Sequence, residues 1–453
     1  MVVSARLIRS PLSIAGMVLT TASAVVFLVV FLADLFGLHT NPYLGIVFFL
    51  ILPAIFVFGL VLIPLGAWLE LRRRAAGKKP SDLSWPRLDL NNPDHRRVAI
   101  AIFALTMVNI IIVSLAAYRG VEYMDSVQFC SQACHTVMQP EGTAHQYGPH
   151  ARVACVKCHV GSGATSYAKA KWAGTRRLLA VSFNTYSRPI PTPQNLPPAS
   201  DTCEQCHRSA TSHGDKVRRI VEYGDDEKNT ESVTTLQMHV GGPGRAGTAS
   251  GIHWHADAAT EIDYISTDDK REVIPYVRVK DHTGAVREYV VEGTTPEQLA
   301  GTRRRMDCMD CHNRPSHQVA ATAERAVDAA IARAAIPSDL PYIRREAVKV
   351  LKGGYPTEDA AMAAIAKSLG DFYRGSYEGI YSTRRQDVDT AVAGAQQVYR
   401  RNVFPEMNVQ FGTYPSNVGH IDFPGCFRCH DDNHATKDGG KISQDCETCH
   451  KIE

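Results

Sequence analysis

The chain has 453 residues, enough for two or three domains at the usual ~100–200 residues per domain. Its 49 Lys and Arg residues nearly balance 46 Asp and Glu residues, so the net charge of +3 excludes the strong basic excess typical of nucleic-acid-binding proteins. Twelve cysteines indicate disulfides, zinc sites or covalent haem attachment, and their spacing decides among the three.

Residues 1–120 are expected to form a membrane anchor of three helices. Apolar segments near the ~20 residues that a helix needs to cross a bilayer occupy Leu12–Gly37, Tyr43–Trp68 and Val98–Tyr118. The first is too long for the apolar region of a signal peptide. Basic residues precede the first segment and fill the second loop, whereas the first loop has none. The positive-inside rule therefore places the N-terminus in the cytoplasm and residue 121 onward outside it.

Helix, sheet and helix follow one another in the remaining chain. A basic segment beginning at Ser162 is expected to be helical to about Phe183 and to end in a proline-rich connector. Alternating patterns predict a small sheet with strands at Val233–Val240, Glu261–Ser266, Val273–Lys280 and Val286–Val291. Alanine-rich periodic stretches predict helices at Gln318–Ala335, Asp339–Lys352, Glu358–Phe372 and Gln386–Arg401.

Six cysteine pairs, each followed directly by histidine, account for all twelve cysteines. Five have the spacing Cys-x-x-Cys-His, the signature of c-type haem attachment, in which two thiols bind the haem and the histidine binds its iron. The first pair has three intervening residues. A zinc site would join two cysteine pairs or add distant histidines, and it does not need a histidine after every pair. Numbered one to six in chain order, the motifs contain Cys130, Cys134 and His135; Cys155, Cys158 and His159; Cys203, Cys206 and His207; Cys308, Cys311 and His312; Cys426, Cys429 and His430; and Cys446, Cys449 and His450.

The second axial ligand decides whether a haem iron transfers electrons or binds a substrate. Of the 18 histidines, six belong to motifs and two precede residue 121, which leaves ten. Those close to a motif or in a glycine-bordered segment are expected to be distal ligands: His150, His239, His255, His317 and His420. For the first iron, Met138 and His145 compete, and an open or weakly filled position is a further alternative.

These features predict a membrane-anchored multihaem cytochrome c. Three transmembrane helices precede a mainly α-helical, loop-rich domain with a small β insertion, in which porphyrins form much of the core. The expected parts are the anchor at 1–120, a region with the first three haems at 121–214, the β-rich insertion at 215–302, the fourth haem with a helical region at 303–405, and a two-haem tail at 406–453.

Several stretches resemble the NapC/NirT/NrfH family of membrane-anchored, quinol-oxidising cytochromes. The resemblance rests on Phe129–His135, Met138, Pro149–His150, Cys155–Gly161 and Ala168–Trp172, together with the fourth motif and its continuation to His317. The three apolar segments, the insertion and the two additional motifs are similar to an elaborated, ImcH-like subgroup of inner-membrane cytochromes in metal-reducing bacteria.

The resemblance implies a cytochrome of anaerobic respiration in the bacterial inner membrane, with its haem domain in the periplasm. It implies that menaquinol is oxidised near the first haem and that six c-type haems relay the electrons to a periplasmic cytochrome or reductase. In that family a lysine and a carboxylate after the second motif form the quinol pocket. Lys169 or Lys171 matches the lysine, whereas no acid matches the carboxylate, for which Glu122, Asp125 or Glu141 are substitutes.

Two other functions stay open. A terminal multihaem reductase of a small oxyanion needs an open iron position, but every motif here keeps its histidine and candidate distal ligands are numerous. A passive electron-transfer subunit would receive its electrons from another membrane protein instead of from quinol.

Overall fold

The computed structural model describes residues 10–35, 52–77, 91–132, 135–161, 164–193, 196–207, 214–243, 249–257 and 259–452. The chain forms two compact units, Met1–Met124 and Asp125–Glu453, each of which is described by itself. Residues 1–9, 36–51 and 78–90, on which much of the predicted orientation rests, lie outside the described residues.

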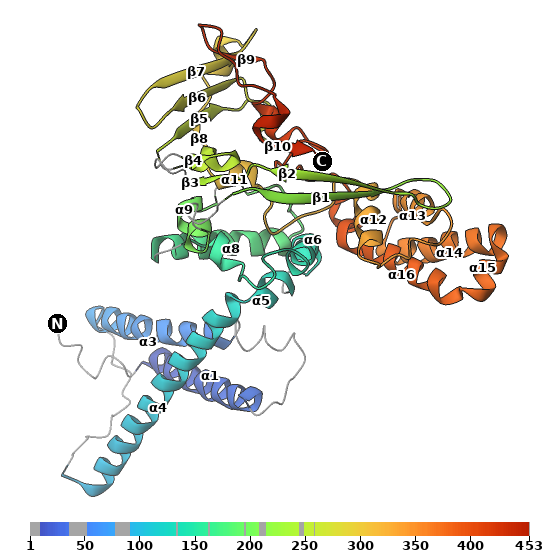
Figure 1. Cartoon of the computed structure of the whole chain (residues 1–453). Helices are drawn as coiled ribbons and strands as arrows, with labels where there is room; N and C mark the ends of the chain where they lie inside the picture. Colours follow the sequence, from blue (N-terminus) through green and yellow to red (C-terminus); the bar gives the residue numbers. More distant parts are fainter. Residues whose placement is uncertain are drawn as a thin grey trace. The chain divides into compact units, whose positions relative to one another are not determined.

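The described residues of the first unit form three long helices, α1 (Pro11–Leu35), α3 (Leu52–Ala75) and α4 (Pro93–Met124) (Figure 1). Small residues let α1 and α3 approach closely: the Ser13 hydroxyl donates to the carbonyl oxygen of Ile63 at 2.9 Å, and a Cβ on Gly16 would lie 2.7 Å from the carbonyl oxygen of Gly59. Such packing is typical of helix pairs in membranes.

Two helices in the described part of the chain are long and apolar enough to cross a membrane, through Ala54–Arg73 and Met107–Met124. The apolar stretch found in α1, Pro11–Phe27, is shorter. A third span therefore stays a prediction.

Short helices carry the first three motifs at the start of the second unit. They are α5 (Val127–Gln132), α6 (His135–Gln146), α7 (Val156–His159), α9 (Ala199–Thr202) and the 3-10 turn η2 (Cys203–Gln205). The longer α8 (Ala164–Ser182) confirms the helix predicted to end near Phe183, before the proline-rich connector.

Two antiparallel sheets and a short strand pair follow. The first sheet has the order β1-β2-β10, and the second has the order β8-β5-β6-β7-β9. The strands are β1 (Lys216–Tyr223), β2 (Glu231–Met238), β3 (Gly242–Pro243), β4 (Ala249–Ser250), β5 (Glu261–Ile265), β6 (Tyr276–Lys280), β7 (Val286–Val291), β8 (Arg304–Arg305), β9 (His434–Ala435) and β10 (His450–Ile452). The four predicted strands are confirmed, and β1 had not been predicted. Because β9 and β10 come from residues 406–453, the tail completes both sheets (Figure 1).

A helical region between the fourth and fifth motifs has a core of its own. It consists of α12 (Ala323–Ala332), α13 (Ile343–Leu351), α14 (Glu358–Ser376), α15 (Glu378–Thr383) and α16 (Arg385–Asn402), which confirms the four predicted helices and adds α15. Fully buried Ile365, Leu369, Tyr373 and Tyr399 lie in this core, and the cluster includes no motif residue. Packed side chains therefore form the core of this helical region.

Candidate haem-binding sites

Each of the five regularly spaced motifs folds into a single helical turn. The amide nitrogen of the second cysteine lies 3.1–3.2 Å from the carbonyl oxygen of the first in motifs two, three, five and six. The histidine amide reaches the same carbonyl at 2.8–3.0 Å in motifs two to five. Residues at i, i+3 and i+4 share one face of a helical turn. Both thiols and the imidazole of a motif therefore belong to one face, as covalent haem attachment requires.

Each of the five motif histidines faces a histidine from elsewhere in the chain. The ring centroids are 6.0 Å apart for His159 and His317, 5.9 Å for His207 and His150, 6.4 Å for His312 and His253, 5.9 Å for His430 and His255, and 6.2 Å for His450 and His420. Two imidazoles that bind one metal ion from opposite sides, through bonds of about 2 Å, have ring centroids about 6 Å apart. The spacing of all five pairs fits one iron between two rings.

Hydrogen bonds orient several of these rings. The Nδ1 atoms lie 2.7–3.2 Å from backbone carbonyl oxygens in His150, His255, His317 and His430. Because a carbonyl oxygen only accepts, Nδ1 donates its proton and Nε2 is left available to a metal ion. Burial lowers the pKa of the His159, His255 and His317 rings below the ordinary value of 6.5, which favours the neutral form that binds metal. The donor set fits haem iron.

Four of the five expected distal ligands lie opposite a motif histidine: His150, His255, His317 and His420. The fifth, His239, has no ring contact with a motif histidine among the residues that the structure describes. Its Nδ1 instead lies 3.0 Å from Asp215 Oδ2. The ring opposite His312 belongs to His253, which was not among the expected ligands although it stands two residues before His255.

Neither His434 nor His145 faces a motif histidine among the described residues, although the ring centroid of His145 lies 6.3 Å from that of His317. His434 is 1% exposed, and its two ring nitrogens contact Asp431 Oδ1 at 2.8 Å and the carbonyl oxygen of Ile274 at 2.7 Å. His145 is also buried, and its Nε2 lies 2.9 Å from the carbonyl oxygen of Val153. These hydrogen bonds occupy both ring nitrogens of His434 and one ring nitrogen of His145.

The first motif is described only in part. Cys130 lies in α5, whereas Cys134 and the side chain of His135 are outside the described residues. Met138, a candidate sixth ligand, is partly buried on α6. The Cys130 and Cys155 side chains are hydrogen-bonded to each other, so the first and second motifs are direct neighbours.

The other motifs also neighbour one another in chain order. Cys158 lies near Cys203 and Cys206, and Cys203 lies near Cys308. Cys311 lies near Cys426, and Cys426 lies near Cys449. The six motifs therefore form a continuous series from the first to the sixth.

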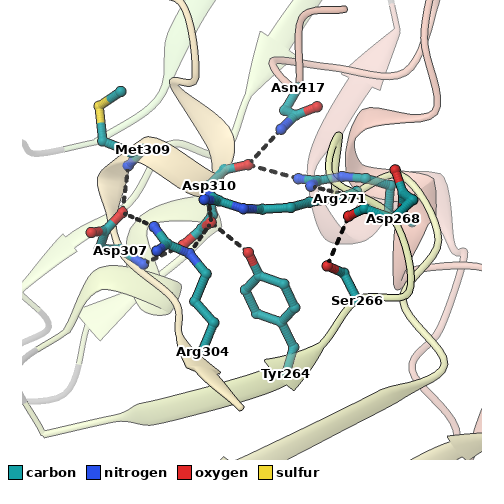
Figure 2. Close-up of polar contacts among 10 residues, drawn as sticks. Tyr264, Ser266, Asp268, Arg271, Arg304, Asp307, Met309, Asp310 and Asn417 are labelled. Carbon is teal, nitrogen blue, oxygen red and sulfur yellow. Dashed lines mark hydrogen bonds and ion pairs between the residues drawn. The ribbon is translucent and has the colours of Figure 1, made fainter. Parts of the chain in front are cut away.

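A buried polar cluster holds the fourth motif against the sheet (Figure 2). The Asp310 carboxylate is 1% exposed and accepts hydrogen bonds from Tyr264 at 2.6 Å, Arg304 at 2.9 Å and Arg271 at 3.2 Å. The backbone oxygen of Asp310 accepts from Arg428 Nη2 at 2.7 Å. Since Asp310 and Arg428 stand between the cysteines of the fourth and fifth motifs, this hydrogen bond joins the two motifs directly.

The residues expected at a quinol site belong to both units. In the first, Glu122 near the end of α4 pairs with Arg119 at 2.7 Å, and both side chains are exposed. In the second, Asp125 is partly buried and Lys169 is exposed on α8, while the side chain of Lys171 is outside the described set.

Glu141 is the third substitute for the missing carboxylate. It accepts hydrogen bonds from Arg314 at 3.2 Å and lies 3.1 Å from Nδ1 of His317. Its carboxylate is therefore engaged beside an expected distal ligand.

Residues 92–190 match the model of the NapC/NirT cytochrome c family, N-terminal region. Over 448 residues the chain is 39% identical to the cytochrome c-type protein ImcH of Geobacter sulfurreducens, an alignment that covers 98% of this chain and 88% of ImcH. No solved structure matches the chain.

Proposed function

Because the chain belongs to the NapC/NirT cytochrome c family, in the subgroup that includes ImcH, we propose that it oxidises menaquinol in the bacterial inner membrane and passes the electrons to a periplasmic cytochrome or reductase. Family membership makes it a membrane-anchored electron-transfer protein with covalently bound c-type haem. The proposal adds six haems, one at each motif, and three membrane spans. The haems supply the redox couples, while the chain attaches them, ligates them and sets their surroundings.

The observation that carries the proposal is the set of five histidine pairs at 5.9–6.4 Å. An iron held by a motif histidine and a distal histidine keeps no position for a substrate, so these sites suit electron transfer. A terminal reductase needs at least one open iron, and none of the five pairs provides it. For the first iron we propose Met138 as the distal ligand.

The order of the motifs supports a relay. Cysteines of successive motifs lie near one another from the first motif to the sixth in chain order. Electrons that enter beside the first motif, which follows the membrane anchor in the sequence, would leave near the sixth. The first motif is thus the proposed entry for quinol electrons, and the tail is the proposed exit to the acceptor.

Helix α8 supports a quinol site at the membrane surface. Trp172 and Phe183, in and just after this helix, are 73% and 74% exposed, and Leu179 is 53% exposed. Basic residues accompany them, and Ser162–Ser200 contains no acidic residue. A basic helix with exposed aromatic and aliphatic side chains is typical of the lipid headgroup region. Lys169 and Lys171 would there meet the headgroup of a quinol.

The test is reduction of the purified protein by a menaquinol analogue in detergent under anaerobic conditions, followed at the haem α-band. The double variant Lys169→Ala/Lys171→Ala is expected to slow this reduction about tenfold or more, since one hydrogen bond to a charged group contributes about 1.5–3 kcal/mol. Reduction by dithionite, which needs no quinol site, should be unchanged.

The matched control is Lys367→Ala, which removes an exposed lysine from α14. No reduction of the unmodified protein by quinol would eliminate direct quinol oxidation and favour the passive subunit. Equal rates for the double variant and the control would exclude the two lysines from the quinol site. A high-spin ferric signal from one of the outer haems would support the reductase instead.

A further inference from the structure

We propose that one short turn, η4 (Ile252–Ala256), supplies the distal ligands of two irons, His253 to the fourth haem and His255 to the fifth, and so makes these haems a rigid pair. The inference rests on the haem-attachment part of the proposed function and is independent of quinol oxidation. Because the turn belongs to the β-rich insertion, the insertion gains a role in haem ligation.

The geometry assigns the two rings to different irons. His253 lies 6.4 Å from His312 of the fourth motif, and His255 lies 5.9 Å from His430 of the fifth. In a 3-10 helix with three residues per turn, side chains two positions apart point in directions about 120° apart. The two imidazoles therefore diverge from the turn and cannot serve the same iron.

Backbone hydrogen bonds hold the turn against the two residues that follow β2. The amide of Ile252 donates to the carbonyl oxygen of His239 at 2.8 Å, and the amide of His253 donates to that of Val240 at 3.0 Å. Gly251 precedes the turn with φ +70°, and a Cβ there would collide with the carbonyl oxygen of His239. Only glycine allows the two backbone segments to lie this close without strain. Backbone contacts therefore fix the position at which the turn begins.

Trp254 anchors the turn from between the two histidines. It packs against the cluster of Ile262, Tyr264, Ile274 and Val277, and Cys429 of the fifth motif packs against the same cluster. On the side of the motifs, Arg428 donates to the backbone of Asp310. The fourth and fifth sites are therefore linked twice, through their motifs and through their distal ligands.

The first experiment removes each ring separately. The variants His253→Gly and His255→Gly of the full-length protein are oxidised in detergent and examined by electron paramagnetic resonance. Each should convert one low-spin haem to a high-spin ferric haem, the double variant should convert two, and added imidazole should restore the low-spin signals. His282→Gly, in an exposed turn, is the matched control and should retain the original spectrum.

The second experiment tests the shared turn. Trp254→Ala keeps both imidazoles but removes their anchor, so two low-spin signals should shift together while the others stay constant. A shift of only one signal, or of none, would overturn the rigid pair. A high-spin haem in His239→Gly but not in His253→Gly would overturn the assignment of His253.

Two measurements distinguish the loss of a haem ligand from misfolding and from the loss of quinol oxidation. The haem content of each variant is counted by pyridine haemochrome, and His253→Met, which keeps an iron ligand, should remain low-spin with one midpoint potential raised. An unchanged set of potentials would contradict ligation by His253. Reduction by quinol is measured separately. If quinol does not reduce the haems but the predicted spin changes occur, only the proposal of quinol oxidation is contradicted, and the ligand assignment stands.

Discussion

Replacing Asp310 by asparagine tests how the fourth motif is held (Figure 2). One carboxylate oxygen accepts from Tyr264, Arg271 and Arg304, and the other accepts from the amide of Asp307 at 2.8 Å. The last bond belongs to a capping box that starts α11 (Cys308–Cys311). Asparagine keeps one accepting oxygen, but its NH₂ group cannot accept a hydrogen bond from the Asp307 amide.

The expected loss of folding free energy follows from these contacts. The broken capping-box bond costs about 1 kcal/mol. The Arg271 and Arg304 side chains are 22% and 33% exposed, so solvent screens their loss of a countercharge. Each then costs about 0.5–1 kcal/mol, which brings the total to about 2–3 kcal/mol. For a unit of about 330 residues, with an unfolding entropy of about 2.1 cal/mol/K per residue, this lowers the thermal midpoint by roughly 3–4 °C.

The assay is thermal unfolding of the oxidised protein in detergent, followed by far-ultraviolet circular dichroism and by the Soret band. Asp310→Ala, which removes the buried carboxylate that Tyr264, Arg271 and Arg304 share, should lower the midpoint further than Asp310→Asn. Asp371→Asn is the matched control, because this exposed acid pairs only with Lys367 and Arg374 on its own helix in the described structure. Equal midpoints for Asp310→Asn and Asp371→Asn would refute the reasoning.

Two further changes probe other parts of the molecule. Gly59→Leu should separate α1 from α3, because a Cβ at Gly59 would lie only 2.5 Å from Thr20 Oγ1. Hydrogen–deuterium exchange in α1 should then be faster than in the unmodified protein. An unchanged exchange rate would contradict the close packing of the two helices. The pKa of Glu261 is lowered by hydrogen bonds from Arg305 and Lys280. Its contribution to stability is therefore present above its ordinary pKa of 4.5 and is lost as the pH falls through the lowered value. Glu261→Gln should lower the thermal midpoint more at pH 7 than at pH 3, whereas an equal difference at both values would contradict this assignment.

Local patterns predicted most helices and four strands because periodicity reports which face of an element is buried. They missed β1, whose first four residues are exposed, so Lys216–Tyr223 shows no alternation of buried and exposed positions. The two- and three-residue strands β9 and β10 have no local signal, because pairing with β7 and β2 defines them.

The motif residues are predictable because covalent attachment needs a fixed spacing, but the partner of each motif histidine is not. His150 stands between the first two motifs yet faces His207 of the third, and His317 follows the fourth motif yet faces His159 of the second. Proximity in sequence therefore identified candidates without assigning them. His239 and His253 lie in the same glycine-bordered part of the chain, and only the tertiary structure separates the ring near Asp215 from the ring near His312.

The β insertion and the C-terminal tail depend on each other physically. The tail supplies β9 and β10, which pair with β7 and β2 of the insertion, and without them both of those strands would expose unpaired backbone edges. The insertion in turn places His255 opposite His430 of the tail. The insertion alone would leave two sheet edges unpaired and His255 without its partner ring, and the tail alone would leave the motif histidine His430 without one. The two segments that distinguish this chain from a four-motif cytochrome therefore form one structural unit, and a truncation that removes only the tail should destabilise the insertion as well.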